Sequence, residues 1–377
     1  MIKMKIKIKK LKIEEIMMLI FPIAYFIRFI SNWDIRITSM IWFLAAGILL
    51  FSIARQDKNI IIHMLPFFII DIFAIWSLSI NKTHDIWYIG VLLAPQIWGM
   101  YIFKNKNRLR ALSIVSIIII LYLSVRVFRE PLVLINSWQY GIILSNLVRQ
   151  NTVSIFLVEF LIYHILHRYN QGLEIKYWPI IVGLCAALRC NGAGGILTLS
   201  CMFLGVLLIK KKDNRFSKIK LFFFFSFLVV LIAISRGYQD IIMNFMDDNG
   251  RWYIWSNYVV RTDTLGEVFF GTNVSDHNFL KTSNNMHNTI LNMHYCFGLF
   301  SMIFLISTLL KTIFIIIKRK QHLFAIILGV TLLRAMTDEA YFAFGAIWVY
   351  FYLETSLNSS KNVDMGRQQK NFTLSKV

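Results

Sequence analysis

Long apolar stretches recur along the whole chain, and they restrict its fold more than any other feature of the sequence. Of the 377 residues, 57% are hydrophobic, and the mean hydropathy is +0.60. The apolar runs are about 15–20 residues long, close to the length that a helix needs to cross the hydrocarbon core of a bilayer. The short alternating segments of a membrane β-barrel do not occur in the sequence. We therefore predict an all-α integral membrane protein.

The apolar runs predict about twelve transmembrane helices. The expected spans are residues 16–30, 37–53, 60–80, 86–103, 111–128, 152–167, 177–189, 193–209, 221–236, 287–310, 322–336 and 341–354. They divide the chain into a basic N-terminal arm (1–15), a first group of five helices (16–128), an outer loop (129–151), a second group (152–236), a long outer loop (237–286), a third group (287–354) and a tail (355–377). The long outer loop mixes polar and aromatic residues, so we expect it to form short helices at the membrane surface.

Topology explains the net charge of +20. Lys and Arg gather in every second connection, and the connections between these contain few basic residues. The basic segments are the N-terminal arm, 55–58, 104–110, 168–176, 210–220, 311–320 and the C-terminal tail. This is the positive-inside pattern of a multi-pass protein of the bacterial inner membrane with both termini in the cytoplasm. The charge requires no nucleic-acid partner, and we expect none.

Metal ions and cofactors are not expected. The four cysteines lie in or beside apolar runs without the spacing of metal ligands, and packing as small apolar side chains explains them. His277 and His287 of the long outer loop are too far apart in the sequence to form a local metal motif. His164 and His167 have i,i+3 spacing at an inner helix end, where a metal pair and an interfacial position are alternative explanations.

Several arginines lie at the outer ends of the expected spans, on the side that the positive-inside rule should deplete. An arginine at mid-bilayer costs about 2.5–3.5 kcal/mol, whereas one near the edge can extend its side chain to water at low cost. That explanation suffices for any single arginine, but a group of them indicates an anionic ligand. The group consists of Arg28, Arg126, Arg149, Arg189, Arg236 and Arg334.

Three spans enter the membrane from outside directly after polar and basic residues. Their starts are Arg149–Thr152, Arg189–Gly195 and Ser283–Asn288. The free N–H groups and positive dipole end of a helix start favour an anion, and Asn151, Asn191 and Asn285 are candidate N-caps. The glycines after Asn191 permit either close approach of a phosphate to the backbone or close packing of helices. Three such helix starts would suit a diphosphate.

Four aromatic residues stand together in the long outer loop, namely Trp252, Tyr253, Trp255 and Tyr258. Two explanations are open. They form an interfacial aromatic belt, or they form a surface on which sugar rings stack.

Short motifs in the second half of the chain occur in a recognisable order. Arg189-Cys190-Asn191-Gly192 opens one helix, and Gly250-Arg251 precedes the tryptophan-rich run. Phe270-Gly271 follows, then His287-Asn288 with Gly298 in the next span, and finally Arg334 with Asp338-Glu339 in a short outer hairpin. Residues 140–345 resemble the O-antigen polymerase and O-antigen ligase superfamily in the order of these motifs and in their expected position on the outer side of the membrane.

The resemblance implies transfer of an oligosaccharide from an undecaprenyl-diphosphate carrier to a sugar hydroxyl on the outer face of the membrane, without a metal and with inversion at the anomeric carbon. Arg251 would be catalytic and, with Arg189, would bind the donor diphosphate. Arg149, Arg334 and Asn191 would assist, and Asn288, Trp252, Trp255 and Asp338 would contact the acceptor and its sugars. His287 would be the base that takes the hydroxyl proton. It could instead only orient the acceptor, with Glu267, Asp276 or Asp338 as the base.

Polymerisation of lipid-linked repeat units is the activity that we favour. Transfer of the glycan to lipid A–core by a ligase is the first alternative, and a lipid-linked-oligosaccharide flippase or other transporter is the second. Transporters carry charges inside several spans, and here only Asp71 and Glu159 lie well inside. The expected partners are the undecaprenyl-diphosphate-linked oligosaccharide and membrane lipid, with a chain-length regulator protein as a candidate.

Overall fold

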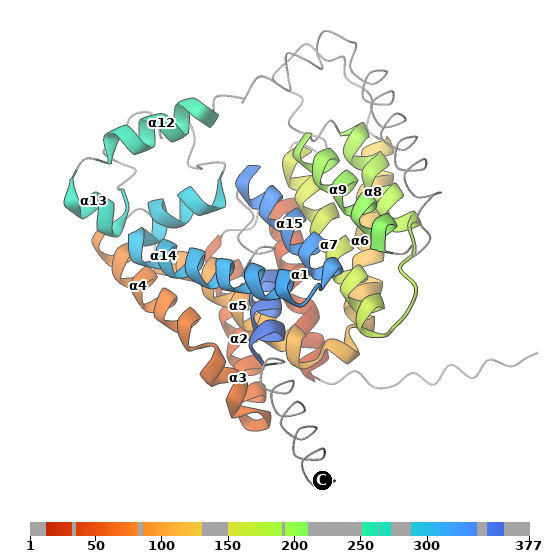
Figure 1. The fold of residues 1–377 in the computed structure, drawn as a ribbon, viewed down its shortest axis with the longest axis horizontal. Coiled ribbons are helices and arrows are strands. Elements are labelled where there is room, and N and C mark those ends of the chain that lie inside the picture. The colour runs from red at the N-terminus through yellow and green to blue at the C-terminus, as the bar shows by residue number, and fades with distance from the viewer. Residues whose placement is uncertain are drawn as a thin grey trace, which may run out of the picture.

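The chain is all-helical in the computed structural model, which describes residues 13–31, 35–81, 86–129, 150–190, 193–209, 251–262, 264–272, 288–337 and 345–357 (Figure 1). Within these ranges there is no β-strand. This confirms the predicted all-α class.

The helices follow the predicted apolar segments closely. The first group is α1 (Ile13–Ser31), α2 (Ile35–Gln56), α3 (Lys58–His63), α4 (Leu65–Asn81), the 3₁₀ helix η1 (Ile86–Ile89), α5 (Gly90–Lys104), η2 (Lys106–Arg108) and α6 (Arg110–Arg129). The remainder are α7 (Gln150–Asn170), α8 (Trp178–Arg189), α9 (Ala193–Ile209), α12 (Arg251–Arg261), α13 (Leu265–Phe270), α14 (Thr289–Lys318), α15 (His322–Thr337) and a helix at 345–357. The predicted span 221–236 lies outside the described residues.

Three of the described helices are long and apolar enough to cross a membrane, over Arg36–Gln56, Arg110–Arg129 and Thr289–Lys318. Shorter apolar helices cover Met18–Ile27, Leu65–Ile80, Trp178–Arg189, Gly194–Leu207 and His322–Met336. Outward-facing Leu44, Phe51 and Phe314 are 69%, 65% and 66% exposed, which is unfavourable in water and suits contact with lipid. The structure is thus compatible with a multi-pass membrane protein, and the count of twelve spans remains a prediction.

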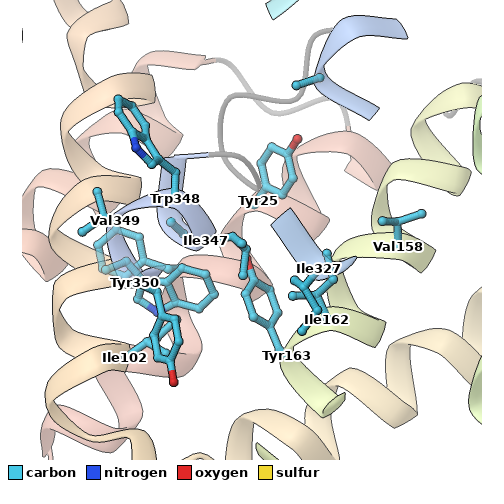
Figure 2. Packing of buried hydrophobic residues seen from close by; sticks show 14 of the residues in the cluster. Tyr25, Ile102, Val158, Ile162, Tyr163, Ile327, Ile347, Trp348, Val349 and Tyr350 are labelled. Carbon is cyan, nitrogen blue, oxygen red and sulfur yellow. The ribbon is translucent and has the colours of Figure 1, made fainter. Parts of the chain in front are cut away.

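Large aromatic side chains form much of the core. Trp98 of α5 donates from Nε1 to the Met18 carbonyl of α1 at 2.9 Å, and its ring meets Tyr163 of α7 edge-on at 4.9 Å. Figure 2 shows Tyr163 and Tyr350 among the aliphatic side chains of neighbouring helices. A buried indole or phenol needs such a polar partner for its N–H or O–H. These contacts join α1, α5, α7 and the helix at 345–357 in one cluster.

The connections predicted to be cytoplasmic meet at one end of the bundle, which we call the basic end. Lys104, at the end of α5, donates to Asp57, between α2 and α3, at 2.9 Å. Lys106 of η2 donates to Glu354 of the last helix, also at 2.9 Å. The final residue of α7, Asn170, hydrogen-bonds the Tyr350 hydroxyl. The structure therefore brings together three of the connections that the charge pattern grouped, at 55–58, 104–110 and the end of α7.

Candidate functional site

The starts of α7 and α9 and the ends of α8 and α15 lie opposite the basic end. Because α7 reaches the basic end with Asn170, its first residue Gln150 lies at the other end. Helices α8 and α9 pack against each other, and α9 also packs on both α7 and α15. This is the arrangement that the sequence predicts for the outer arginines.

Gly195 sets the spacing between α7 and α9. A Cβ atom built on Gly195 would lie 2.2 Å from the Cβ of Ser154, so only glycine fits at this crossing. Of the two explanations for the glycines after Asn191, helix packing is therefore the one that applies to Gly195. Gly192 lies outside the described residues.

Arg334 reaches into this crossing from α15. Its side chain is 3% exposed, and Nη2 donates to Ser154 Oγ at 3.3 Å. A guanidinium this deeply buried requires polar surroundings or an anion. The contact with Ser154 places a positive charge between the halves of α7, α9 and α15 that lie opposite the basic end.

Arg189 is the last residue of α8, and its side chain is partly exposed. The helices α7, α8, α9 and α15 contain a single acidic residue, Glu159. The Glu159 carboxylate lies in the interior of α7 and accepts from the Tyr163 hydroxyl at 2.6 Å. Within these four helices, the end opposite the basic end therefore carries two arginines and two helix starts, and no acidic side chain.

In a second region α13 packs against the first half of α14 (Figure 1), and Tyr258 of α12 reaches the same half of α14. His294 of α14 uses both ring nitrogens there. Nδ1 is 2.5 Å from the hydroxyl of Tyr258 in α12, and Nε2 is 2.8 Å from the carbonyl oxygen of Val268 in α13. One buried side chain thus contacts α12 and α13, the two described helices of the long outer loop.

Gly298 and Gly271, two glycines of the sequence motifs, lie where α13 and α14 approach each other most closely through their backbones. Gly298 interrupts the 30-residue α14 with φ +76°, and a Cβ there would lie 2.5 Å from the carbonyl oxygen of Phe269. Gly271 follows α13 with φ +82°, and its Cβ would lie 2.4 Å from the carbonyl oxygen of Tyr295. A left-handed conformation and this lack of space both require glycine. The Phe-Gly motif and Gly298 therefore form one backbone contact between α13 and the kink of α14.

Several predicted site residues have structural contacts of their own. Asn288 is the N-cap of α14, and its Oδ1 accepts from the backbone N–H groups of Ile290 and Leu291 at 2.9 and 3.1 Å. We expected Asn285 to be this cap, and that prediction is wrong because the helix begins at Thr289. Glu267, an alternative base, closes a capping box with Thr264 at the start of α13.

Other predicted residues are only partly described. Arg251 and Trp252 open α12, and the described side chains of that helix begin at Ile254. Trp255 is half-buried. His287, Arg149, Asn191, Asp276 and Asp338 lie outside the described residues.

Sequence reasoning missed the pair formed by Tyr258 and His294. Tyr258 was assigned either to an interfacial belt or to a sugar-stacking surface, yet it is 3% exposed and faces α14. The available signal was a histidine inside an apolar run, in Asn292-Met293-His294-Tyr295, where a polar side chain needs a partner.

The two carboxyls inside the bundle pair with neutral side chains. Gln96 Nε2 donates to Asp71 Oδ1 at 3.0 Å, as Tyr163 donates to Glu159. His164, which the sequence offered with His167 as a candidate metal pair, contacts a neutral side chain: its Nδ1 lies 2.8 Å from Ser113 Oγ. In the part of the chain that the structure describes, no group of three or more His, Cys, Asp or Glu side chains could hold a metal ion.

Comparison with known proteins gives no assignment, because no family model, no curated protein and no solved structure matches this chain.

Proposed function

We propose that the chain is a glycosyltransferase of the bacterial inner membrane, which joins undecaprenyl-diphosphate-linked oligosaccharide repeat units on the outer face. The observation that supports this most strongly is the buried guanidinium of Arg334 between α7, α9 and α15, opposite the basic end. Arg189 and two positive helix starts share that end. Positive charge gathered at this end of the helices suits the diphosphate of a lipid carrier.

The reaction needs negative charge to be stabilised on the leaving diphosphate. An acceptor hydroxyl oxygen attacks the anomeric carbon of the donor as the bond from that carbon to the phosphate oxygen breaks, and the configuration inverts. Undecaprenyl diphosphate leaves, and His287 takes the hydroxyl proton. A hydrogen bond to a charged group contributes about 1.5–3 kcal/mol. If two arginines donate such bonds to the diphosphate in the transition state, they account for a rate increase of several powers of ten.

The α12–α13 region supplies the remaining parts of the proposed site. It carries Arg251, which we assign to the diphosphate, and Trp252 and Trp255, which we assign to the sugars. This region contacts α14 at His294, about two helical turns after Asn288. Asn288 directly follows His287, the proposed base. The resemblance of His287-Asn288 and Gly298 to the superfamily motif supports the same assignment.

Deletion of the gene distinguishes the three candidate activities on a gel of surface glycan. Loss of a polymerase leaves core that carries a single repeat, which is the result that we expect. Naked core with long lipid-linked chains indicates a ligase, and absence of repeats from the outer leaflet indicates a flippase. Complementation with Arg251→Ala or His287→Ala should restore the inserted protein without restoring chain extension, and full-length glycan from both variants would contradict the proposed site.

A further inference from the structure

The hydrogen bonds of His294 have only one consistent assignment for a neutral ring. The carbonyl oxygen of Val268 can only accept, so Nε2 carries the proton and donates to it. Nδ1 then accepts from the Tyr258 hydroxyl. Burial raises the pKa of Tyr258 above its ordinary value of 10.0, so the hydroxyl remains a donor at any physiological pH. Both ring nitrogens are therefore satisfied, each by a different helix.

The two helices depend on His294 to different degrees. Helix α13 has other contacts, because Gly271 and Gly298 bring its end against α14, the Phe269 and Phe300 rings stack at 5.6 Å, and Phe270 meets Trp76 of α4 at 5.0 Å. In α12, Tyr258 is the only described side chain that is buried, whereas Val259 beside it is 65% exposed. The contact of Tyr258 with His294, beside its ring contact with Tyr295 at 6.1 Å, is therefore the most deeply buried link between the described part of α12 and α14.

We propose that His294 is a positioning residue for glycosyl transfer, which holds α12 in register with the start of α14. Arg251 begins α12 seven residues before Tyr258, and His287 precedes His294 by the same seven residues. Within α12, the seven residues from Arg251 to Tyr258 are about two helical turns, or about 10 Å along the helix axis. Fixing Tyr258 against His294 therefore fixes where the helix that carries Arg251 begins relative to α14. This inference rests on the proposed function, since it assigns the diphosphate to Arg251.

Hydrogen exchange on the full-length protein in nanodiscs tests the contact without any assay of activity. His294→Leu keeps the bulk but removes both hydrogen bonds, and we expect the amides of residues 251–261 to exchange at least about tenfold faster. His294→Gln retains one donor and one acceptor, and Tyr258→Phe removes only the hydroxyl, so both should fold. We expect the Gln variant to stay within about threefold of the native rate. His322→Leu, at the start of α15, is the matched control and should leave α12 unchanged.

Kinetics with lipid-linked repeat units test the positioning role. We expect His294→Leu to lower kcat by about tenfold or more, with the donor KM changed by less than about threefold, and His294→Gln to recover most of the loss. Combining Tyr258→Phe with His294→Leu should add little to the single effects, because both remove the same hydrogen bond.

The outcomes separate the two claims. Unchanged exchange in α12 of His294→Leu, or additive effects of the two substitutions on kcat, would overturn the positioning role alone. Faster exchange in α12 together with a folded native protein that extends no glycan would overturn the proposed function, and the positioning role with it.

Discussion

Gly195 of α9 and Ser154 of α7 cross so closely that a Cβ on the glycine would lie 2.2 Å from the serine Cβ. The same serine hydroxyl receives a hydrogen bond from buried Arg334 of α15. The close crossing therefore places the hydroxyl where the guanidinium can reach it. In this way a packing contact between two helices determines the position of a positive charge.

Substitution of Gly195 by alanine should disturb both the crossing and the arginine. Overpacking of this kind destabilises by about 1–3 kcal/mol, and the measurement is the midpoint of thermal unfolding in detergent. Gly329→Ala on α15 is the matched control, because nothing lies within 4 Å of its Cβ position. Alanine there should be neutral or slightly stabilising through helix propensity. Equal unfolding midpoints for the two variants would show that the crossing is not tight.

Replacement of Arg334 by lysine tests whether the shape of the guanidinium matters as well as its charge. Lysine keeps the positive charge but cannot make two parallel hydrogen bonds to a phosphate. We expect chain extension to fall by about tenfold or more in a glycan assay, with normal insertion of the protein. Arg108→Lys, an exposed substitution at the basic end, should extend glycan at the native rate. Full activity of Arg334→Lys would remove Arg334 from the proposed diphosphate site.

Gly298→Ala should separate α13 from the kink of α14. Its backbone is left-handed with φ +76°, and the added methyl group would meet the Phe269 carbonyl oxygen at 2.5 Å. We expect a loss of at least about 1–2 kcal/mol and greater protease sensitivity of the loop between α12 and α13. The control is Gly266→Ala within α13, whose nearest neighbour is 4.0 Å away. A native proteolysis pattern for Gly298→Ala would mean that the chain accommodates the methyl group elsewhere.

The ion pair at the basic end predicts a small dependence of stability on pH. The hydrogen bond from Lys104 lowers the pKa of Asp57 below its ordinary value of 3.8. The stabilisation is therefore present above that value and is lost as the pH falls through the lower pKa of the folded state. Because the pair is partly exposed, it contributes about 0.2–1 kcal/mol. Asp57→Asn should unfold earlier than the native protein at pH 7 and together with it near the folded pKa, and a difference that persists in acid would exclude this cause.

Hydropathy and charge predicted the features of the fold that depend on single segments. Helices α2, α6 and α14 follow long apolar runs of the sequence, and the length and composition of these runs predict helices that could cross a membrane. The spacing of charged residues likewise predicted that the connections containing Asp57, Lys104 and Lys106 lie together, as they do at the basic end. The break at Met64 was missed although Pro66, in the first turn of α4, is a sequence signal for the start of a new helix.

The contacts of the candidate site were less accessible, since they join residues far apart in the chain. Arg334 and Ser154 are separated by 180 positions, and Tyr258 and His294 by 36. Gly195 had two equally good explanations until Ser154 was seen opposite it. Gly298 was identified by its motif, but the positive φ that requires glycine is a property of the folded backbone.

Chain extension by the purified protein is the most direct test of the central claim, which is that Arg334 helps to hold a lipid diphosphate during glycosyl transfer. Lipid-linked repeat units extracted from a strain without the gene would be added to proteoliposomes containing the native protein or Arg334→Gln. We predict a ladder of longer lipid-linked glycans from the native protein and little or none from the variant. A ladder of equal length and yield from both proteins, or none from correctly folded native protein, would contradict the claim.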